Sequence, residues 1–215
     1  MLKLQDISYK YSKNAPIVLD SICCEFESGK LYSIMGESGS GKTTLISIIA
    51  RLDKPLSGTI FYNGKDVKKI NPDKYRANMV SIIFQQYNLL FNHTAIDNIA
   101  AILRITGYKG DYVKQATKLL TEVALAPEKH NKPVQNLSGG EQQRVAIARA
   151  LASDSGVILA DEPTGNLDKT NEQNVLSIFR KLATEYGKCV IIVTHSNAVA
   201  EFADCRINIA NGRLL

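Results

Sequence analysis

The sequence predicts an α/β fold in which helices cover both faces of a largely parallel sheet. Four short apolar runs, rich in β-branched residues, indicate its strands: LYSIM (31–35), VSIIF (80–84), VILAD (157–161) and VIIVT (190–194). Near-continuous apolar runs are typical of strands that are buried on both faces. Stretches with helical periodicity separate these runs, as they do in α/β proteins.

The first third of the chain predicts an antiparallel β part beside this core. The segments LKLQDIS (2–8) and TIFYNG (59–64) alternate apolar and polar residues, which is typical of strands with one exposed face. At the other end of the chain, RINIA (206–210) and RLL (213–215) flank Asn211-Gly212, a dipeptide that favours two-residue hairpin turns. We therefore expect a hairpin there.

Helical periodicity replaces the strand pattern in the middle of the chain. One apolar stripe at helical spacing is formed by Val113, Ala116, Leu119, Leu120 and Val123. We interpret 86–155 as a helical subdomain inserted into a core that consists of 1–85 and 156–215. The whole chain, 1–215, is then a single domain.

Composition indicates a soluble protein. The chain has 215 residues and a net charge of +5, and no apolar run approaches the roughly 20 residues of a membrane span. The N-terminal residues lack the apolar core of a signal peptide. The four cysteines lie in apolar surroundings without metal-ligand spacing, so we expect buried free thiols in a reducing cytosol; they are Cys23, Cys24, Cys189 and Cys205.

A phosphate-binding loop follows the first parallel strand. The run GESGSGKT (36–43) fits GxxxxGK[ST] between a strand and a helix. Its glycines let successive N–H groups point at phosphate oxygens, while Lys42 supplies a positive charge and the Thr43 hydroxyl suits Mg²⁺. The alternative is a Gly/Ser loop without a ligand, which the Lys-Thr pair disfavours. We predict that the nucleotide contacts Gly36, Glu37, Ser38, Gly39, Ser40, Gly41, Lys42, Thr43 and Thr44.

Two carboxylates end the strand VILAD, at the sheet edge where open α/β sheets bind ligands. We expect Asp161 to hold Mg²⁺. Because side chains alternate along a strand, Glu162 points elsewhere and can deprotonate a water molecule as a general base. For two acids alone, a capping pair at a strand end would be a reasonable alternative.

Two further polar residues follow strands at the same edge. His195 comes directly after VIIVT, and we expect it to contact the γ-phosphate, although an isolated histidine is more often structural. Gln85 follows VSIIF, where its side-chain carbonyl can reach Mg²⁺ or the attacking water. His93 and His130 lack such a context, and we expect both on the surface.

The segment LSGGEQQ (137–143) predicts a second phosphate-binding surface. Ser138 and Glu141 form an S-x-x-E capping box, so a helix begins there. Gly139 and Gly140 leave the first turn without Cβ atoms, so its N–H groups are open to an anion. One chain has no use for a second phosphate cradle, but a two-fold dimer does. Each chain would offer this helix to the ATP held by its partner.

Together these motifs resemble the nucleotide-binding subunit of ABC transporters over essentially the full length of the chain. The resemblance implies a homodimer around two ATP molecules, with Gln85 in the Q-loop and Asp168 in the D-loop at the dimer interface. It also matches Tyr11 to an aromatic residue that stacks on adenine, the alternative being a tyrosine that packs on the sheet. The segments LDKPLSG, IFQQYNLL and ADEPTGNLD look like the lipoprotein-release and macrolide-export branch.

The resemblance also implies a separate membrane permease, with this subunit bound at the cytoplasmic face of the membrane. The apolar cluster Leu89, Leu90 and Phe91 follows Gln85, and part of it is expected to receive a short helix of the permease; the alternative is packing inside the insert. Two rival functions are a soluble ABC ATPase in DNA repair or translation, and an ATPase that acts mechanically on a permease without transport. Long heptad repeats and a second cassette are absent, which disfavours the first rival.

Overall fold

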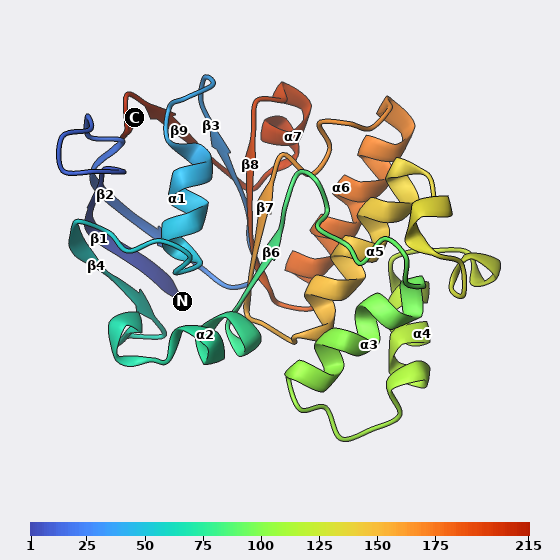
Figure 1. Cartoon of the computed structure of the whole chain (residues 1–215). Helices are drawn as coiled ribbons and strands as arrows, with labels where there is room; N and C mark the ends of the chain where they lie inside the picture. The colour runs from blue at the N-terminus through green and yellow to red at the C-terminus, as the bar shows by residue number, and fades with distance from the viewer.

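The computed structural model describes all residues, 1–215 (Figure 1). The strands are β1 (Leu2–Tyr9), β2 (Leu19–Phe26), β3 (Leu31–Met35), β4 (Ser57–Tyr62), β5 (Lys65–Asp66), β6 (Val80–Ile83), β7 (Val157–Asp161), β8 (Cys189–Thr194), β9 (Cys205–Ala210) and β10 (Arg213–Leu214). The helices are α1 (Lys42–Ile49), α2 (Pro72–Asn78), α3 (Ala95–Ile105), α4 (Tyr112–Glu122), α5 (Gly139–Ala152), α6 (Lys169–Thr184) and α7 (Asn197–Phe202). Short 3₁₀ turns are η1 (Val67–Lys69), η2 (Pro127–Lys129) and η3 (Val134–Asn136). No helix has the length and hydropathy that spanning a membrane requires.

The central sheet has six strands in the order β10-β9-β3-β8-β7-β6. All neighbours from β9 to β6 run parallel, and every residue of β3, β7 and β8 is buried. The predicted parallel core is therefore confirmed. The predicted hairpin is confirmed as β9–β10, where Asn211 and Gly212 both adopt positive φ, as a type I′ turn requires.

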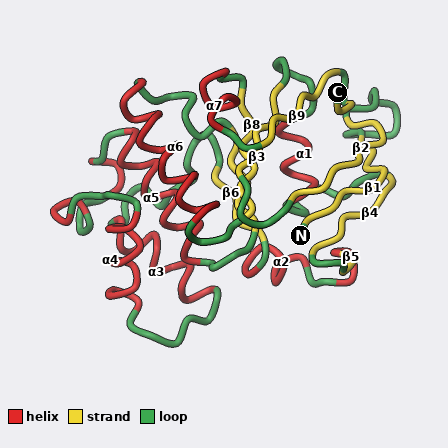
Figure 2. The backbone as a smooth tube through the Cα atoms, turned by 180° about the vertical axis from the view of Figure 1, so that it is seen from behind, coloured by secondary structure: helices red, strands yellow, loops and turns green.

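The N-terminal strands form a separate antiparallel sheet in the order β2-β1-β4-β5. Helix α1 lies between this sheet and one face of the central sheet, and their apolar side chains form one core cluster. Helices α3 to α6 cover the other face and form a second core cluster. Figure 2 shows this division, with α3 to α6 gathered on one side and β1, β2 and β4 on the other. Consequently, α1 and α5 lie on opposite faces of the central sheet.

The chain between β6 and β7 contains helices and no strand, as its periodicity predicted. Four of the five residues in the predicted apolar stripe are buried: Ala116, Leu119 and Leu120 on α4, and Val123 at its C-terminal cap. The fifth, Val113, is 57% exposed. The helix begins at Tyr112, and this ring packs against the core in place of the valine. The expectation for Val113 was therefore wrong.

Two further sequence-based expectations were wrong. His130 is buried, because the η2 turn folds back so that its Nε2 lies 2.9 Å from the carbonyl oxygen of Leu125; His93 is exposed as expected. Among the free thiols only Cys189, on the central strand β8, is buried. Cys23 is exposed and Cys24 and Cys205 are half-buried, because they lie on strands with one open face.

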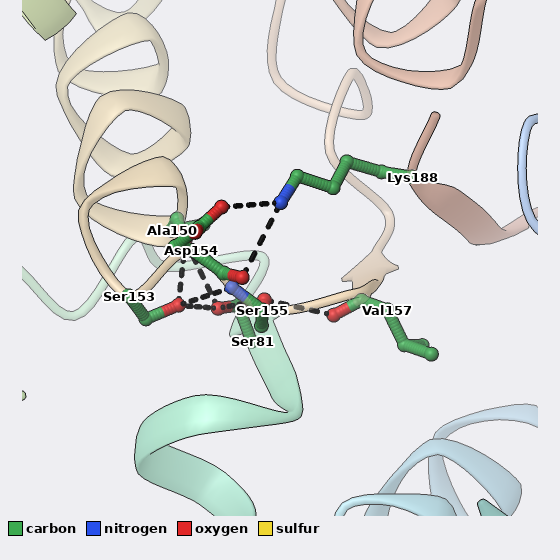
Figure 3. A network of polar contacts seen from close by, with 7 residues as sticks. All are labelled: Ser81, Ala150, Ser153, Asp154, Ser155, Val157 and Lys188. Carbon is green, nitrogen blue, oxygen red and sulfur yellow. Dashed lines mark hydrogen bonds and ion pairs between the residues drawn. The ribbon is translucent and has the colours of Figure 1, made fainter. Parts of the chain in front are cut away.

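A buried cluster of serines joins the end of α5 to the central sheet (Figure 3). The hydroxyl of Ser81 on β6 lies 2.5 Å from that of Ser153 and 2.7 Å from that of Ser155. Ser81 also donates to the carbonyl of Ala150, the last turn of α5, at 3.0 Å. Because buried hydroxyls must find partners, this cluster fixes one orientation of α5 against β6 and β7.

Candidate functional site

The loop between β3 and α1 has the conformation that its glycines predict. Gly41 caps α1 with φ 104°, and a Cβ there would lie 2.9 Å from the carbonyl oxygen of Val18. A Cβ at Gly36 would lie 2.3 Å from the carbonyl oxygen of Ile209. Both positions therefore require glycine. The first turn of α1 points unpaired N–H groups toward the end of the sheet, which favours an anion there.

Lys42 and Thr43 are held at this end of the sheet by polar contacts. The buried Lys42 donates through Nζ to the carbonyl oxygens of Gly36 and Glu37, at 2.7 and 2.9 Å. The Thr43 hydroxyl donates to Oδ1 of Asp161 at 3.3 Å. Burial raises the pKa of the Asp161 carboxyl above its ordinary value, and the neighbouring Glu162 adds to the effect. A hard cation beside Asp161 would favour the ionised form and oppose this shift.

Glu162 has other partners than Asp161, although the expected strand alternation is not the reason, because β7 ends at Asp161. Its carboxylate accepts a hydrogen bond from Oγ1 of Thr194 at 3.2 Å and lies 2.8 Å from Nδ1 of His195. Glu162 itself has φ 47°, the left-handed region that non-glycine residues rarely adopt. The backbone N–H of Glu162 still bonds the carbonyl of Val193, so the strained residue is anchored to β8.

These groups line one cleft of about 520 Å³ at the carboxyl ends of the parallel strands. Its walls are Tyr11, Val18, Ser38, Gly39, Gly41, Lys42, Thr43, Thr44, Gln85, Glu162 and His195. Gly36, Glu37 and Ser40 border a second hollow on the far side of the loop, beside β9. The sequence thus predicted most of the cleft, from elements far apart in the chain.

Tyr11 lies at the rim of the cleft. Its ring is 67% exposed and meets Tyr9 edge-on, with 5.1 Å between the ring centroids. Its hydroxyl forms a hydrogen bond with Oγ1 of Thr44, at 2.8 Å. Tyr9 is buried in the sheet, so of the two tyrosines only Tyr11 presents a ring to a ligand.

Sequence reasoning missed two residues of this site. Val18 precedes β2 and reaches the phosphate loop through the close contact with Gly41, which no local pattern reveals. Thr194, the last residue of β8, bonds Glu162. The sequence could have indicated Thr194, because it is the last residue of β8 and directly precedes His195.

The segment Ser138–Glu141, termed here the signature segment, lies outside the cleft. Ser138 and Glu141 form the predicted capping box, with bonds of 2.8 and 3.3 Å. Gly139 is exposed, but a Cβ at Gly140 would lie 2.7 Å from Oδ1 of Asn171 on α6. Close packing on α6 is therefore a second reason for glycine at 140, besides an open first turn.

Asp168 caps the N-terminus of α6 instead of reaching the cleft of its own chain. Its carboxylate accepts from the backbone N–H and the side-chain amide of Asn171, at 2.9 and 2.7 Å. These bonds lower the pKa of Asp168 below its ordinary value. Since Asn171 also packs on Gly140, Asp168 is linked to the signature segment through one side chain.

The apolar cluster after Gln85 divides into buried and open parts. Leu89 is 6% exposed and belongs to the core under α3 and α5, whereas Leu90 and Phe91 are each 48% exposed. The buried amide of Asn98 on α3 bonds both the N–H and the carbonyl of Leu90. The main chain here is therefore fixed while two apolar side chains stay open.

Comparison with known proteins decides the family. The profile of the ABC transporter family matches residues 19–165, which include the phosphate loop, the signature segment and Glu162. The chain belongs to this family. It is an ABC-type ATPase cassette, which binds and hydrolyses ATP.

Relatives in several bacteria resemble this cassette over nearly its whole length. The uncharacterized ABC transporter ATP-binding protein YclH of Bacillus subtilis is 40% identical, over 99% of this chain and 94% of its own. The lipoprotein-releasing system ATP-binding protein LolD of Rickettsia felis is 39% identical, over 100% of this chain and 97% of its own. The macrolide export ATP-binding/permease protein MacB of Chlorobaculum tepidum is 41% identical, but the chain spans only 32% of that protein.

A solved cassette shares the fold. The ATP-binding cassette MJ0796, solved as a dimer bound to ADP and Pi in a post-hydrolysis state, superposes with a TM-score of 0.89. It is 36% identical, over 100% of this chain and 96% of its own. The predicted fold class, an α/β cassette with an antiparallel part, is thereby confirmed.

Proposed function

We propose that the cassette holds MgATP in the cleft, pairs with a second copy around two nucleotides, and uses hydrolysis to drive a separate membrane permease. One observation carries this proposal. Polar groups from the ends of three strands, β6, β7 and β8, meet beside the phosphate loop, with Thr43 bonded to Asp161 and Glu162 paired with His195. Oxygen donors at the first pair suit Mg²⁺, and an acid–imidazole contact at the second suits proton transfer.

Thr43, Asp161 and Gln85 would hold the magnesium ion. No cluster of three acidic or histidine side chains offers a complete cage. This donor set fits Mg²⁺, which usually takes one or two carboxylates and completes its shell with phosphate oxygens and water. When bound, the ion would neutralise charge that develops on the β- and γ-phosphate oxygens.

Glu162 acts as the general base in this proposal. Its carboxylate takes a proton from a water molecule while the water oxygen bonds to the γ-phosphorus and the bond to the ADP oxygen breaks. Thr194 and His195 fix the carboxylate through its two oxygens. Lys42 and His195 stabilise negative charge on the transferring group.

The signature segment serves the nucleotide of the partner subunit. Two facts support this reading: α5 lies on the opposite face of the central sheet from α1, and the cleft has no wall from residues 138–141. The exposed Ser138 and Gly139 at the start of α5 are therefore available to a phosphate that another chain holds. Asp168 would lie at the same dimer interface, since it is linked to Gly140 through Asn171.

The substitution Ser138→Arg tests this assignment. We expect nucleotide affinity of the monomer to stay within about threefold of the wild-type value while hydrolysis falls by about 100-fold or more, as for loss of a preorganised phosphate donor. Thr94→Arg is the matched control, because Thr94 forms the same capping box at α3, far from the phosphates. Calorimetric ATP binding and steady-state phosphate release would be measured. Similar loss in both variants, or loss of monomer affinity in Ser138→Arg, contradicts the proposal.

The proposed permease docks on the helical subdomain, 86–155. Leu90 and Phe91 form its contact, while Leu89 supports them from the core. An apolar partner helix would bury both open side chains on a fixed main chain. The subunit would then lie at the cytoplasmic face of the membrane. By similarity to the relatives named for lipoprotein release and macrolide export, we propose that the cargo is a lipoprotein, a peptide or an antimicrobial compound.

A further inference from the structure

Two consecutive residues behind Gln85 adopt an unfavourable backbone conformation. Tyr87 has φ 60° and Asn88 has φ 48°, so both lie in the left-handed region without being glycine. A bulky aromatic residue is a genuine outlier there, and such residues persist only where the surroundings impose the conformation. Their N–H groups close tight turns onto the carbonyls of Phe84 and Gln86.

One side chain bonds both residues of this turn. The guanidinium of Arg149 donates to the carbonyl oxygen of Tyr87 at 2.7 Å and to that of Asn88 at 2.5 Å. The planar fork of an arginine suits two neighbouring acceptors, whereas the ammonium group of a lysine acts as a point charge. These are the hydrogen bonds of the Arg149 side chain, and both acceptors belong to the turn.

Arg149 lies in the last turn of α5, the helix that begins with the signature segment. Tyr87 lies near the other end of the same helix, because a Cβ built on Gly139 would be 3.7 Å from its hydroxyl. The turn after Gln85 is thus hydrogen-bonded to one end of α5 and lies near the other. The serine cluster in turn fixes the end of α5 to β6, the strand that leads to Gln85.

We propose that Arg149 is a positioning residue for ATP hydrolysis. Its fork holds the Tyr87–Asn88 turn in the left-handed conformation, and the turn keeps Gln85 at a fixed place relative to the signature segment. Gln85 faces the nucleotide of its own chain, and the signature segment faces that of the partner. Arg149 therefore sets the relation between the two nucleotide sites of a dimer. This inference rests on the proposed roles of Gln85 and Ser138.

Arg149→Lys removes the fork and keeps the charge. We expect kcat for ATP to fall by about tenfold, and KM to change by less than about threefold, because the phosphate loop is untouched. Arg76→Lys is the matched control, because Arg76 lines the same surface hollow as Arg149. Arg76 also donates to the carbonyl of a residue with positive φ, Arg51. Its kcat should stay within about twofold of the wild-type value.

A rescue distinguishes positioning from mere stability. Glycine adopts the left-handed region without strain, so Asn88→Gly should restore kcat of Arg149→Lys to within about threefold of the wild-type value. Asn88→Val tests the turn with Arg149 intact and at an exposed residue, where no core packing is lost. A β-branched side chain opposes positive φ, so kcat should fall as in Arg149→Lys, while melting drops by only the few degrees that one strained residue costs and the variant stays folded at the assay temperature.

The full-length chain would be used throughout, with steady-state ATPase kinetics and melting curves for every variant. Wild-type kcat in Arg149→Lys or in Asn88→Val, an equal loss in Arg76→Lys, or a loss that Asn88→Gly does not restore, would overturn the inference. Gln85→Ala and Ser138→Arg are measured in parallel. If these two hydrolyse ATP like the wild type, the proposed function fails instead.

Discussion

At the residue scale, the site depends on one strained glutamate. Glu162 in the left-handed region costs roughly 1–2 kcal/mol relative to an ordinary conformation. The cost is offset by the bond of its N–H to Val193 and by the contacts of its carboxylate with Thr194 and His195. The two adjacent acids contact different groups: Asp161 accepts from Thr43, and Glu162 contacts Thr194 and His195.

Glu162→Gln should keep ATP binding and slow hydrolysis by about 100-fold or more, as expected for loss of a general base. The amide keeps the size of the side chain and can still accept from Thr194, so the cleft keeps its shape. Glu172→Gln is a matched control, since Glu172 also accepts bonds from hydroxyls nearby but lies outside the cleft. Phosphate release and size exclusion with ATP and Mg²⁺ would be measured. A Glu162→Gln variant that turns over like the wild type, or never dimerises, contradicts the assignment.

The sequence predicted this site well because its residues lie in short local motifs. A phosphate loop, a strand that ends in two acids and a histidine after another strand each carry their own pattern. Val18 and the Gly140–Asn171 contact could not be predicted, since they depend on elements far apart in the chain. His130 was misjudged for the same reason: its partner, the carbonyl of Leu125, becomes available only when η2 folds back.

At the scale of elements, the serine cluster fixes helix α5 of the helical subdomain to strands β6 and β7 of the central sheet. The serine cluster is buried and satisfied within itself, and the surface pair of Lys188 with Asp154 lies above it (Figure 3). The same helix α5 carries Arg149 and the signature segment. Its orientation therefore affects hydrolysis as well as stability. Periodicity predicted this helix, but not the polar contacts that fix it.

Ser81→Ala should lower the free energy of unfolding by about 1–3 kcal/mol, because a buried hydrogen-bond partner is lost. The loss stays within this range, since Ser153 and Ser155 keep the carbonyls of Ala150 and Val157 as acceptors. Asp154→Asn is the control and should cost less than about 1 kcal/mol, because the Asp154 side chain is 95% exposed and Lys188 keeps its bond to the carbonyl of Asp154. Urea unfolding of both variants measures the difference. Equal midpoints for the two would show that the cluster does not fix α5 to the sheet.

At the scale of the whole molecule, the surface of the helical subdomain around Phe91, between β6 and α3, is the proposed contact with the membrane partner. Phe91→Glu should reduce the amount of cassette recovered with the membrane fraction of its host by about tenfold, because a charge would be buried in an apolar contact. Leu56→Glu, at another exposed apolar residue, should not. Melting curves should match the wild type in both. If Phe91→Glu is recovered with the membrane fraction in the same amount as the wild type, this segment is not the docking site. If the variant unfolds, Phe91 packs inside the subdomain instead.

The strand order of the central sheet has a consequence for how the chain is made. β3 carries the phosphate loop, and its two neighbours in the sheet, β8 and β9, come from residues 189–210. At 5–20 residues per second, a ribosome needs about 8–30 s to proceed from the end of β3 to the start of β8. During that time the apolar strand LYSIM has no partner on either side. A nascent cassette therefore needs protection from aggregation until residues 189–210 emerge, and it cannot close its nucleotide site before then.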